Sequence, residues 1–151
     1  MHSSKHGVTG MSLSTEQVQA FMDYLEDAMP VKAKVHKAGK KKTDTAVRDA
    51  DVYHIEHEAT ELYDILQEVA KMVNLYFKYD LTGIEKAQIM HYKAPSNGYN
   101  YHIDLEPHTS ETSRKVSVSI LLNDEYEGGE ICFRTSEEGT CQKPETGNVV
   151  A

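Results

Sequence analysis

Two stretches of the chain repeat hydrophobic residues at the three- and four-residue spacing of an amphipathic helix. Before the first stretch, Ser14 and Gln17 stand as in a capping box, and Pro30 follows it; both are boundary signals for a helix. The apolar positions are Val18, Phe21, Met22, Leu25 and Met29 in the first stretch, and Leu62, Ile65, Leu66, Val69, Met72, Val73 and Tyr76 in the second. The pattern predicts two helices that turn these faces toward a core.

The pattern changes to short strands in the rest of the chain. Between residues 115 and 123, apolar residues at even positions alternate with Ser117, Ser119 and Leu121, which is typical of a strand with one buried face. We expect strands within 46–58, 84–92, 99–104, 115–123 and 131–134, and two more within 139–151. Two helices packed on many short antiparallel strands predict an α+β protein with a sandwich or jelly-roll core.

Length and composition fit one folded domain. The chain has 151 residues, of which 39% are hydrophobic and 26% charged, enough to form a core. We assign residues 1–13 to a flexible N-terminus or a tag remnant, and residues 14–151 to a single domain. No apolar run reaches the length of a membrane span and no signal peptide is visible, so no membrane partner and a cytoplasmic location are expected. Cys132 and Cys141 give no sign of a disulfide framework, which fits that compartment.

The charge of the chain disfavours nucleic acid as a partner. The formal net charge is −8, which repels a phosphate backbone. The local exception is residues 31–42, VKAKVHKAGKKK, with six lysines. Such a run is usually a solvated loop; the alternative is a flap that closes over an acidic or extended substrate.

A histidine and an aspartate two positions apart form the candidate metal site. His102 and Asp104 lie in the segment YNYHID, and residues i and i+2 of a strand point to the same face. Two histidines and one carboxylate make up the facial triad of non-haem iron oxygenases. The spacing alone is a weak signal, because His54 and Glu56 repeat it. The strand-rich context favours the pair His102 and Asp104.

Three sequence blocks around this pair are more specific than its spacing. In chain order they read QIMHYKAPSNGYNYHIDLEP, RKVSVSILLNDEYEGGEICF and CQKPETGNVV. Together they resemble the catalytic core of the iron(II)- and 2-oxoglutarate-dependent dioxygenases, and more narrowly the prolyl 4-hydroxylase and PKHD-type branch found in bacteria and phages. The resemblance covers about residues 84–151. It implies a double-stranded β-helix, or jelly-roll, core with supporting N-terminal helices.

The resemblance also implies roles for individual residues. His102 and Asp104 match the first two iron ligands, and Tyr92 matches a tyrosine that contacts 2-oxoglutarate. The remaining assignments are Leu121 for the cosubstrate, and Tyr99, Tyr101 and Arg48 for the substrate. For the tyrosines, packing in a strand or in the core is the alternative reading.

Two functional residues of the family have no counterpart in this sequence. They are the distal histidine ligand and the basic residue that pairs with the distal carboxylate of 2-oxoglutarate. His108 is too close to Asp104 to replace the distal histidine. In the family, the last two strands insert one into each sheet, and without them interior backbone groups lack partners. We therefore expect a chain truncated before the distal histidine, or one completed by another chain.

The resemblance implies an oxidative activity. The expected reaction hydroxylates a C–H bond, that of a peptidyl proline first, and converts 2-oxoglutarate and O2 to succinate and CO2. Iron(II) and 2-oxoglutarate are the expected cofactors, with ascorbate as a candidate reductant, and a peptide or protein is the expected partner. One alternative is a non-catalytic jelly-roll module that binds a peptide or sugar. Another is a cupin-like metalloenzyme.

Overall fold

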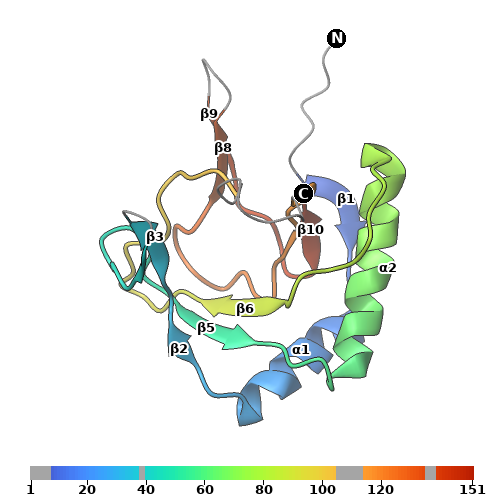
Figure 1. Ribbon diagram of the computed structural model, residues 1–151, viewed down its shortest axis with the longest axis horizontal. Helices are drawn as coiled ribbons and strands as arrows, with labels where there is room; N and C mark the ends of the chain where they lie inside the picture. Colours follow the sequence, from blue (N-terminus) through green and yellow to red (C-terminus); the bar gives the residue numbers. More distant parts are fainter. Residues whose placement is uncertain (1–7, 38–39, 105–113, 135–138) are drawn as a thin grey trace.

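The computed structural model describes residues 8–37, 40–104, 114–134 and 139–151 (Figure 1). This part of the chain is of mixed α/β type, with two helices and several small antiparallel sheets, so the predicted α+β class is confirmed at this level. The helices are α1 (Thr15–Asp27) and α2 (Thr60–Phe77), and the strands are β1 (Val8–Ser12), β2 (Val31–Lys32), β3 (Val35–Lys37), β4 (Lys40–Lys42), β5 (Asp51–His54), β6 (Gln88–His91), β7 (Ser119–Ile120), β8 (Ile131–Arg134), β9 (Gly139–Gln142) and β10 (Asn148–Val150).

Both predicted helices are confirmed, and local chemistry explains their ends. At the start of α1, Ser14 Oγ accepts a hydrogen bond from Gln17 N at 3.2 Å, and Gln17 Oε1 accepts one from Ser14 N at 2.9 Å. These are the reciprocal bonds of a capping box. Helix α2 ends at Lys78, whose φ of 56° is left-handed. The Asn74 side chain bonds both the N–H and the carbonyl of Tyr79, which caps the last turn.

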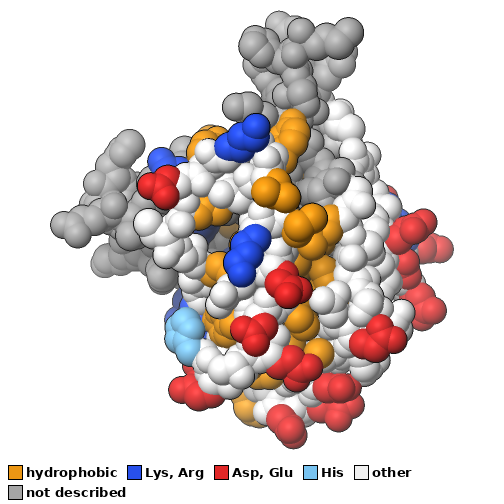
Figure 2. Space-filling model, turned by 90° about the vertical axis from the view of Figure 1, so that its right-hand side faces the viewer, with side chains coloured by type: hydrophobic (Ala, Val, Ile, Leu, Met, Phe, Trp, Pro, Cys, Tyr) orange, Lys and Arg blue, Asp and Glu red, His pale blue; other side chains and the backbone are white. Residues whose placement is uncertain are grey.

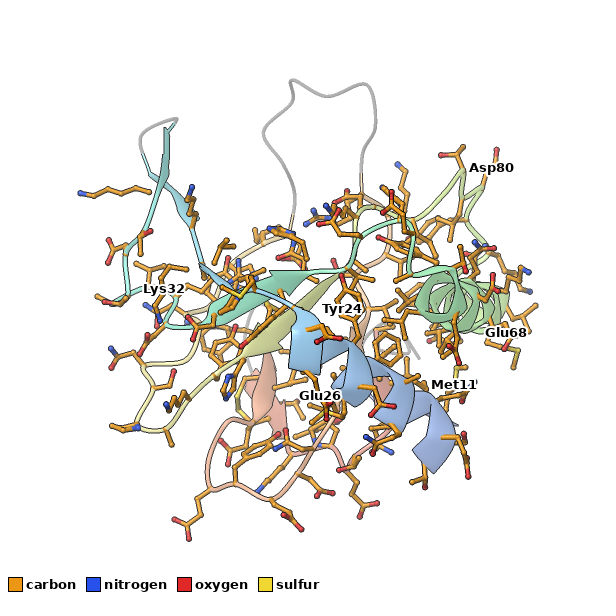
Figure 3. All side chains as sticks on the ribbon, turned by 90° about the horizontal axis from the view of Figure 1, so that it is seen from below. Met11, Tyr24, Glu26, Lys32, Glu68 and Asp80 are labelled. Atoms are coloured by element: carbon orange, nitrogen blue, oxygen red, sulfur yellow. A yellow bond between two sulfur atoms is a disulfide. The ribbon has the colours of Figure 1, made fainter. Side chains whose placement is uncertain are left out.

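The apolar faces of the two helices meet the strands in one core. Its buried residues are Val18 and Phe21 from α1, Leu62, Tyr63, Ile65, Val69 and Val73 from α2, and Leu13, Ile55, Ile89 and Val149 from the strands and their ends. Tyr24 ties α1 to the end of β5 (Figure 3), since its hydroxyl donates to the His54 carbonyl and accepts from Glu56 N, both at 3.0 Å. The Tyr63 hydroxyl likewise donates to the Ile55 carbonyl at 2.9 Å. These contacts fix both helices against the sheet that leads to the candidate site.

The strands form two three-stranded antiparallel sheets and two hairpins among the described residues. The sheet orders are β1-β10-β7 and β2-β5-β6, and the hairpins are β3-β4 and β8-β9. Residues 8–12, which the sequence analysis placed in the N-terminal tail, instead form β1 and pair with β10. Residues 31–42 contain β2 and the β3-β4 hairpin in place of the expected solvated loop. The alternative, a flap over the substrate, stays a prediction.

Two predicted strands are shorter than expected or missing. Of residues 115–123, only Ser119–Ile120 form a strand, β7, because their partner β10 is short and pairs with them at two positions. Val118 was expected on the buried face, yet it is 38% exposed. Residues 101–104 are irregular, so the expectation that His102 and Asp104 lie on a strand is wrong.

The two cysteines form a disulfide, of which the sequence pattern shows no sign. Cys132 in β8 and Cys141 in β9 are joined. The hairpin register places these residues directly opposite each other, where side chains on one face of a sheet meet. The cysteines therefore give no support to the expected cytoplasmic location.

The surface shows where the negative charge gathers. Acidic side chains collect toward one edge of the face in Figure 2. A groove of about 410 Å³ lies between the first turn of α1 and the first half of α2, and its acidic lining residues are Glu16, Glu61, Asp64 and Glu68. Neither His102 nor Asp104 lines this groove. In the described part of the chain, neither helix combines the length and apolar character needed to cross a membrane.

Candidate metal centre

The candidate site stands on two segments that pair with each other, residues 45–49 and 96–100. Asp49 N–H donates to the Gly98 carbonyl at 2.9 Å, and Arg48 and Tyr99 form an antiparallel bridge. The side chains of residues 96, 97 and 100 each donate to a backbone carbonyl of the first segment. These bonds hold residues 96–100, which follow β6, against residues 45–49, which precede β5. They thereby place the segment 99–104 beside Arg48.

His102 and Asp104 lie side by side. Nε2 of His102 is 3.0 Å from Oδ1 of Asp104, and the two side chains are 38% and 46% exposed. An ion from solvent can therefore reach both groups. The two side chains lie together, as their spacing indicated, although an irregular segment brings them together in place of a strand and they are partly exposed in place of pointing inward.

A backbone carbonyl sets the orientation of the His102 ring. Nδ1 lies 2.8 Å from the carbonyl oxygen of Asn100. Because a carbonyl oxygen only accepts, Nδ1 carries a proton in this hydrogen bond, and Nε2 is the nitrogen that can bind a metal. Metal-binding histidines commonly hold their other ring nitrogen in this way. Nε2 faces Oδ1 of Asp104 directly, a contact that is an ion pair when the ring carries both protons; a metal would bind Nε2 of the neutral ring.

The ring of Tyr99 contacts both His102 and Arg48. The ring centroids of Tyr99 and His102 are 3.7 Å apart with an interplanar angle of 21°. The Arg48 Cζ lies 4.6 Å from the Tyr99 centroid, within the range of a cation–π interaction. Two residues assigned to the substrate, Tyr99 and Arg48, thus lie together and next to the first candidate ligand.

Tyr92, assigned to 2-oxoglutarate, contacts the same arginine. Burial raises the pKa of the Tyr92 phenol, and the charge and hydrogen bond of Arg48 partly oppose this rise. The phenol is therefore protonated at neutral pH and can donate a hydrogen bond. Arg48 itself donates through Nη2 to the sulfur of Met90 in β6. The structure thus joins Arg48, Tyr92, Tyr99 and His102 in one cluster.

Arg114 holds the backbone of the second candidate ligand. Its Nη1 donates to the Asp104 carbonyl at 3.1 Å, while Nη2 and Nε bind the Glu85 carboxylate at 2.6 and 3.2 Å. Such a two-point pair is strong and directional. Sequence reasoning assigned no role to Glu85, Met90 or Asn100. No pattern marks them, since two act through long-range contacts and the third through its backbone carbonyl.

Two predicted site residues belong to other parts of the structure. Leu121 donates its N–H to the Asn148 carbonyl at 3.1 Å and accepts from Gly147 N at 2.7 Å, which places it beside β10. Tyr101 is 59% exposed, and its hydroxyl would lie 3.7 Å from a Cβ added at Gly139. Tyr101 therefore leans toward the β8-β9 hairpin.

The described residues bring together two candidate metal ligands, His102 and Asp104. In this part of the chain no three His, Cys, Asp or Glu side chains form a group that could hold a metal. His108, rejected as a third ligand on sequence grounds, lies outside the described residues. In the rival pair of His54 and Glu56, the carboxylate is engaged elsewhere. It forms an ion pair with Lys86 at 2.5 Å, and the Lys86 hydrogen bond lowers the pKa of Glu56.

Comparison with known proteins adds no relative to this picture. A scan against protein-family models, a search of curated proteins and a search of solved structures each found no match. The resemblance carried by the three sequence blocks therefore stays a prediction. The functional assignment rests on these blocks and on the geometry of the cluster.

Proposed function

We propose that the protein is an iron(II)- and 2-oxoglutarate-dependent dioxygenase that hydroxylates a C–H bond, with a peptidyl proline as its substrate. The observation that carries the proposal is the convergence of His102 Nε2 and Asp104 Oδ1, which are 3.0 Å apart. An imidazole and a carboxylate that leave coordination positions open are the ligands typical of this enzyme class. The sequence blocks around them support the same assignment.

The residues present fit part of an iron site. His102 offers Nε2 and Asp104 a carboxylate oxygen, and both are accessible to solvent. The third ligand of the triad has to come from residues outside those described or from another polypeptide. When bound, iron(II) and 2-oxoglutarate would supply the oxidising power for hydroxylation, and ascorbate would keep the metal reduced.

The other residues of the cluster prepare these two ligands. Asn100 holds Nδ1–H of the imidazole, Tyr99 packs on its face, and Arg114 holds the backbone of Asp104. Such support restricts the rotamers of a ligand before the metal arrives. The Tyr92 phenol is a donor suited to a carboxylate oxygen of 2-oxoglutarate.

The double-stranded β-helix is part of the same proposal. Two antiparallel three-stranded sheets and the two helices share one core in the described part of the chain. Strands β6 and β7 stand at the ends of the sheet orders, and an edge strand offers backbone groups that another strand can pair with. These edges are where the two further strands of the fold would add.

Anaerobic titration of iron(II) in the presence of 2-oxoglutarate tests the proposal. The unaltered protein should develop the visible charge-transfer band of an iron–oxoglutarate complex, and His102→Ala should lose it. His57→Ala is the matched control, because His57 also stacks on a tyrosine, Tyr63, with centroids 5.2 Å apart. This variant should keep the band. After air is admitted, mass spectrometry should find one added oxygen atom on a proline of a peptide substrate.

Two results would overturn the proposal. A band that survives in His102→Ala would mean that iron binds elsewhere. No band in the unaltered protein, together with saturable binding of a proline peptide, would favour the non-catalytic binding module.

A further inference from the structure

We propose that Arg48 and Tyr92 form a carboxylate-binding site beside the candidate metal centre. The ligand is a single carboxylate group, carried by a dicarboxylate such as the cosubstrate or by an acidic residue of a peptide. The inference goes beyond the proposed oxygenase activity, because a carboxylate can bind to these two residues without a metal.

Among the described residues, Arg48 forms no ion pair with an acidic side chain, unlike Arg114, Lys32 and Lys86. Those three cations pair with Glu85 at 2.6 Å, Asp51 at 2.6 Å and Glu56 at 2.5 Å, respectively. Among the same residues, the Arg48 guanidinium instead hydrogen-bonds the Tyr92 hydroxyl and the Met90 sulfur and stacks on Tyr99. A thioether sulfur is a weak acceptor. An incoming carboxylate would therefore replace a weak contact by a strong, charge-assisted one.

One nitrogen of Arg48 is buried without any partner. Within the described part of the chain, Nε has no hydrogen-bond acceptor and is closed off from solvent. Buried donors are nearly always paired in folded proteins, so an unpaired one calls for an explanation. Nε and an adjacent Nη form the fork that fits the two oxygens of a carboxylate. A carboxylate that displaces the Met90 sulfur would give both nitrogens an acceptor.

Tyr92 provides a second donor for the same ligand. Its pKa is raised, first of all by burial, so the hydroxyl keeps its proton. In the described structure this hydroxyl faces the Met90 sulfur at 3.9 Å, the weak acceptor that Arg48 also uses. Arg48 and Tyr92 therefore direct their donors to one place, which a sulfur atom occupies and a carboxylate would fit better.

The position and charge of this pair define its ligand. Arg48 and His102 contact the same ring, that of Tyr99, so a carboxylate on Arg48 lies close to the candidate ligands. The protein carries a net charge of −8, which disfavours a polyanion. One guanidinium and one phenol match a ligand with a single carboxylate at this point.

A chemical-shift titration of the metal-free, 15N-labelled protein tests the site. The probe is glutarate, and glutaramide at equal ionic strength is its uncharged counterpart. Glutarate should shift the amide signals of Tyr99 and Asn100 in a saturable manner, and glutaramide should not. Equal, saturable shifts with both compounds would overturn the proposal, because the site would then not recognise charge. No saturable shift with any carboxylate probe would overturn it as well.

Substitutions test whether Arg48 and Tyr92 are the residues that bind glutarate. Arg48→Gln should weaken glutarate binding at least about tenfold, the size expected for a hydrogen bond to a charged group. Tyr92→Phe should weaken it by a smaller factor. Lys143→Gln is the matched control, since Lys143 Nζ also lies 4.6 Å from a tyrosine centroid, that of Tyr126. This variant should bind glutarate as the unaltered protein does, and equal weakening by it would overturn the proposal.

A variant that keeps the charge covers the case in which Arg48→Gln does not fold. Arg48→Lys retains the cation but loses the planar fork, so it should fold and bind glutarate several-fold more weakly. Unchanged binding in folded Arg48→Lys and Tyr92→Phe would overturn the proposal.

A second titration distinguishes the two possible carriers of the carboxylate, a dicarboxylate and an acidic peptide. Acetyl-Pro-Glu-amide, compared with acetyl-Pro-Gln-amide, reports a preference for an acidic peptide, whereas binding of glutarate alone identifies the dicarboxylate. The iron–oxoglutarate band distinguishes the two proposals. If it forms while no carboxylate probe binds at Arg48, the oxygenase function stands and the carboxylate site fails.

Discussion

The imidazole of His102 stacks on the ring of Tyr99, with centroids 3.7 Å apart, while its Nδ1 lies 2.8 Å from the Asn100 carbonyl. The ring is thus held both on its face and at its edge. These two contacts leave Nε2 directed at Asp104. The arrangement suits a ligand that is positioned before the metal binds.

Removal of the Tyr99 ring should weaken metal binding by His102 and Asp104. Tyr99→Leu deletes the surface that holds the imidazole, and loss of such support commonly lowers metal affinity by about tenfold or more. The dissociation constant for iron(II), measured anaerobically, provides the check. Tyr99→Phe keeps the ring and should bind iron as the unaltered protein does. Equal affinity in Tyr99→Leu would show that the stacking does not support the ligand.

The sequence predicted the helices well because their signals are local. Ser14 and Gln17 form the capping bonds that their spacing indicates. Most of the apolar stripe from Leu62 to Val73 faces the core, but Met72 and Tyr76, predicted on the same face, are 54% and 56% exposed, and Met29 beyond α1 is 85% exposed. The strands were predicted less well. Alternation in 115–123 indicated the core contacts of Val116, Ile120 and Leu122, but Val118 is exposed. The length of β7 depends on β10, its distant partner.

The candidate site was only partly predictable for the same reason. The spacing of His102 and Asp104 indicated that they converge, and the structure brings them together. The contacts of Arg48 with Tyr99, Tyr92 and Met90 arise from the pairing of residues 45–49 with 96–100. No sequence period encodes a pairing between segments this far apart. The disulfide likewise depends on the register of the β8-β9 hairpin.

Gly147→Ala should destabilise the protein by about 3 kcal/mol, because two unfavourable effects add. Gly147 has φ +85°, and an added Cβ would lie 2.9 Å from the Leu13 carbonyl oxygen. Equilibrium urea unfolding measures the change. Gly83→Ala is the control: a Cβ at Gly83 meets nothing within 4 Å, so its stability should change by less than about 0.5 kcal/mol. Equal stability of the two variants would contradict the close approach of Gly147 to the Leu13 backbone.

The Asp124 carboxylate should stabilise the fold in a pH-dependent way. Thr146 N donates to its Oδ2 at 3.0 Å, and this bond lowers the pKa of Asp124. A carboxyl with a lowered pKa in the folded state stabilises the protein above its unfolded pKa of about 3.9, and the effect is lost as the pH falls through the folded value. Asp124→Asn should therefore lower the melting temperature at pH 7, and the difference should shrink below about pH 4. A difference that stays constant down to pH 2.5 would contradict this role.

Reduction of the disulfide should loosen the β8-β9 hairpin before the rest of the fold. Cys132 and Cys141 are 9 residues apart, and closure of a loop of this length stabilises by about 2–3 kcal/mol in the chain-entropy description. Hydrogen exchange in the hairpin should then speed up by roughly a hundredfold on reduction. Exchange in the β5-β6 pair should change little. The Cys132→Ser, Cys141→Ser double variant should behave like the reduced protein, and unchanged exchange in it would refute the role of the crosslink.

Binding of manganese(II), a redox-stable substitute for iron(II), tests most directly that His102 and Asp104 hold a metal. Electron paramagnetic resonance reports the ion left free in solution. We expect the unaltered protein and His57→Ala to remove one ion per chain from solution, whereas His102→Ala and Asp104→Ala should remove none at the same concentrations. Saturable binding that persists in both of these variants, or the absence of binding by the unaltered protein, would contradict this expectation.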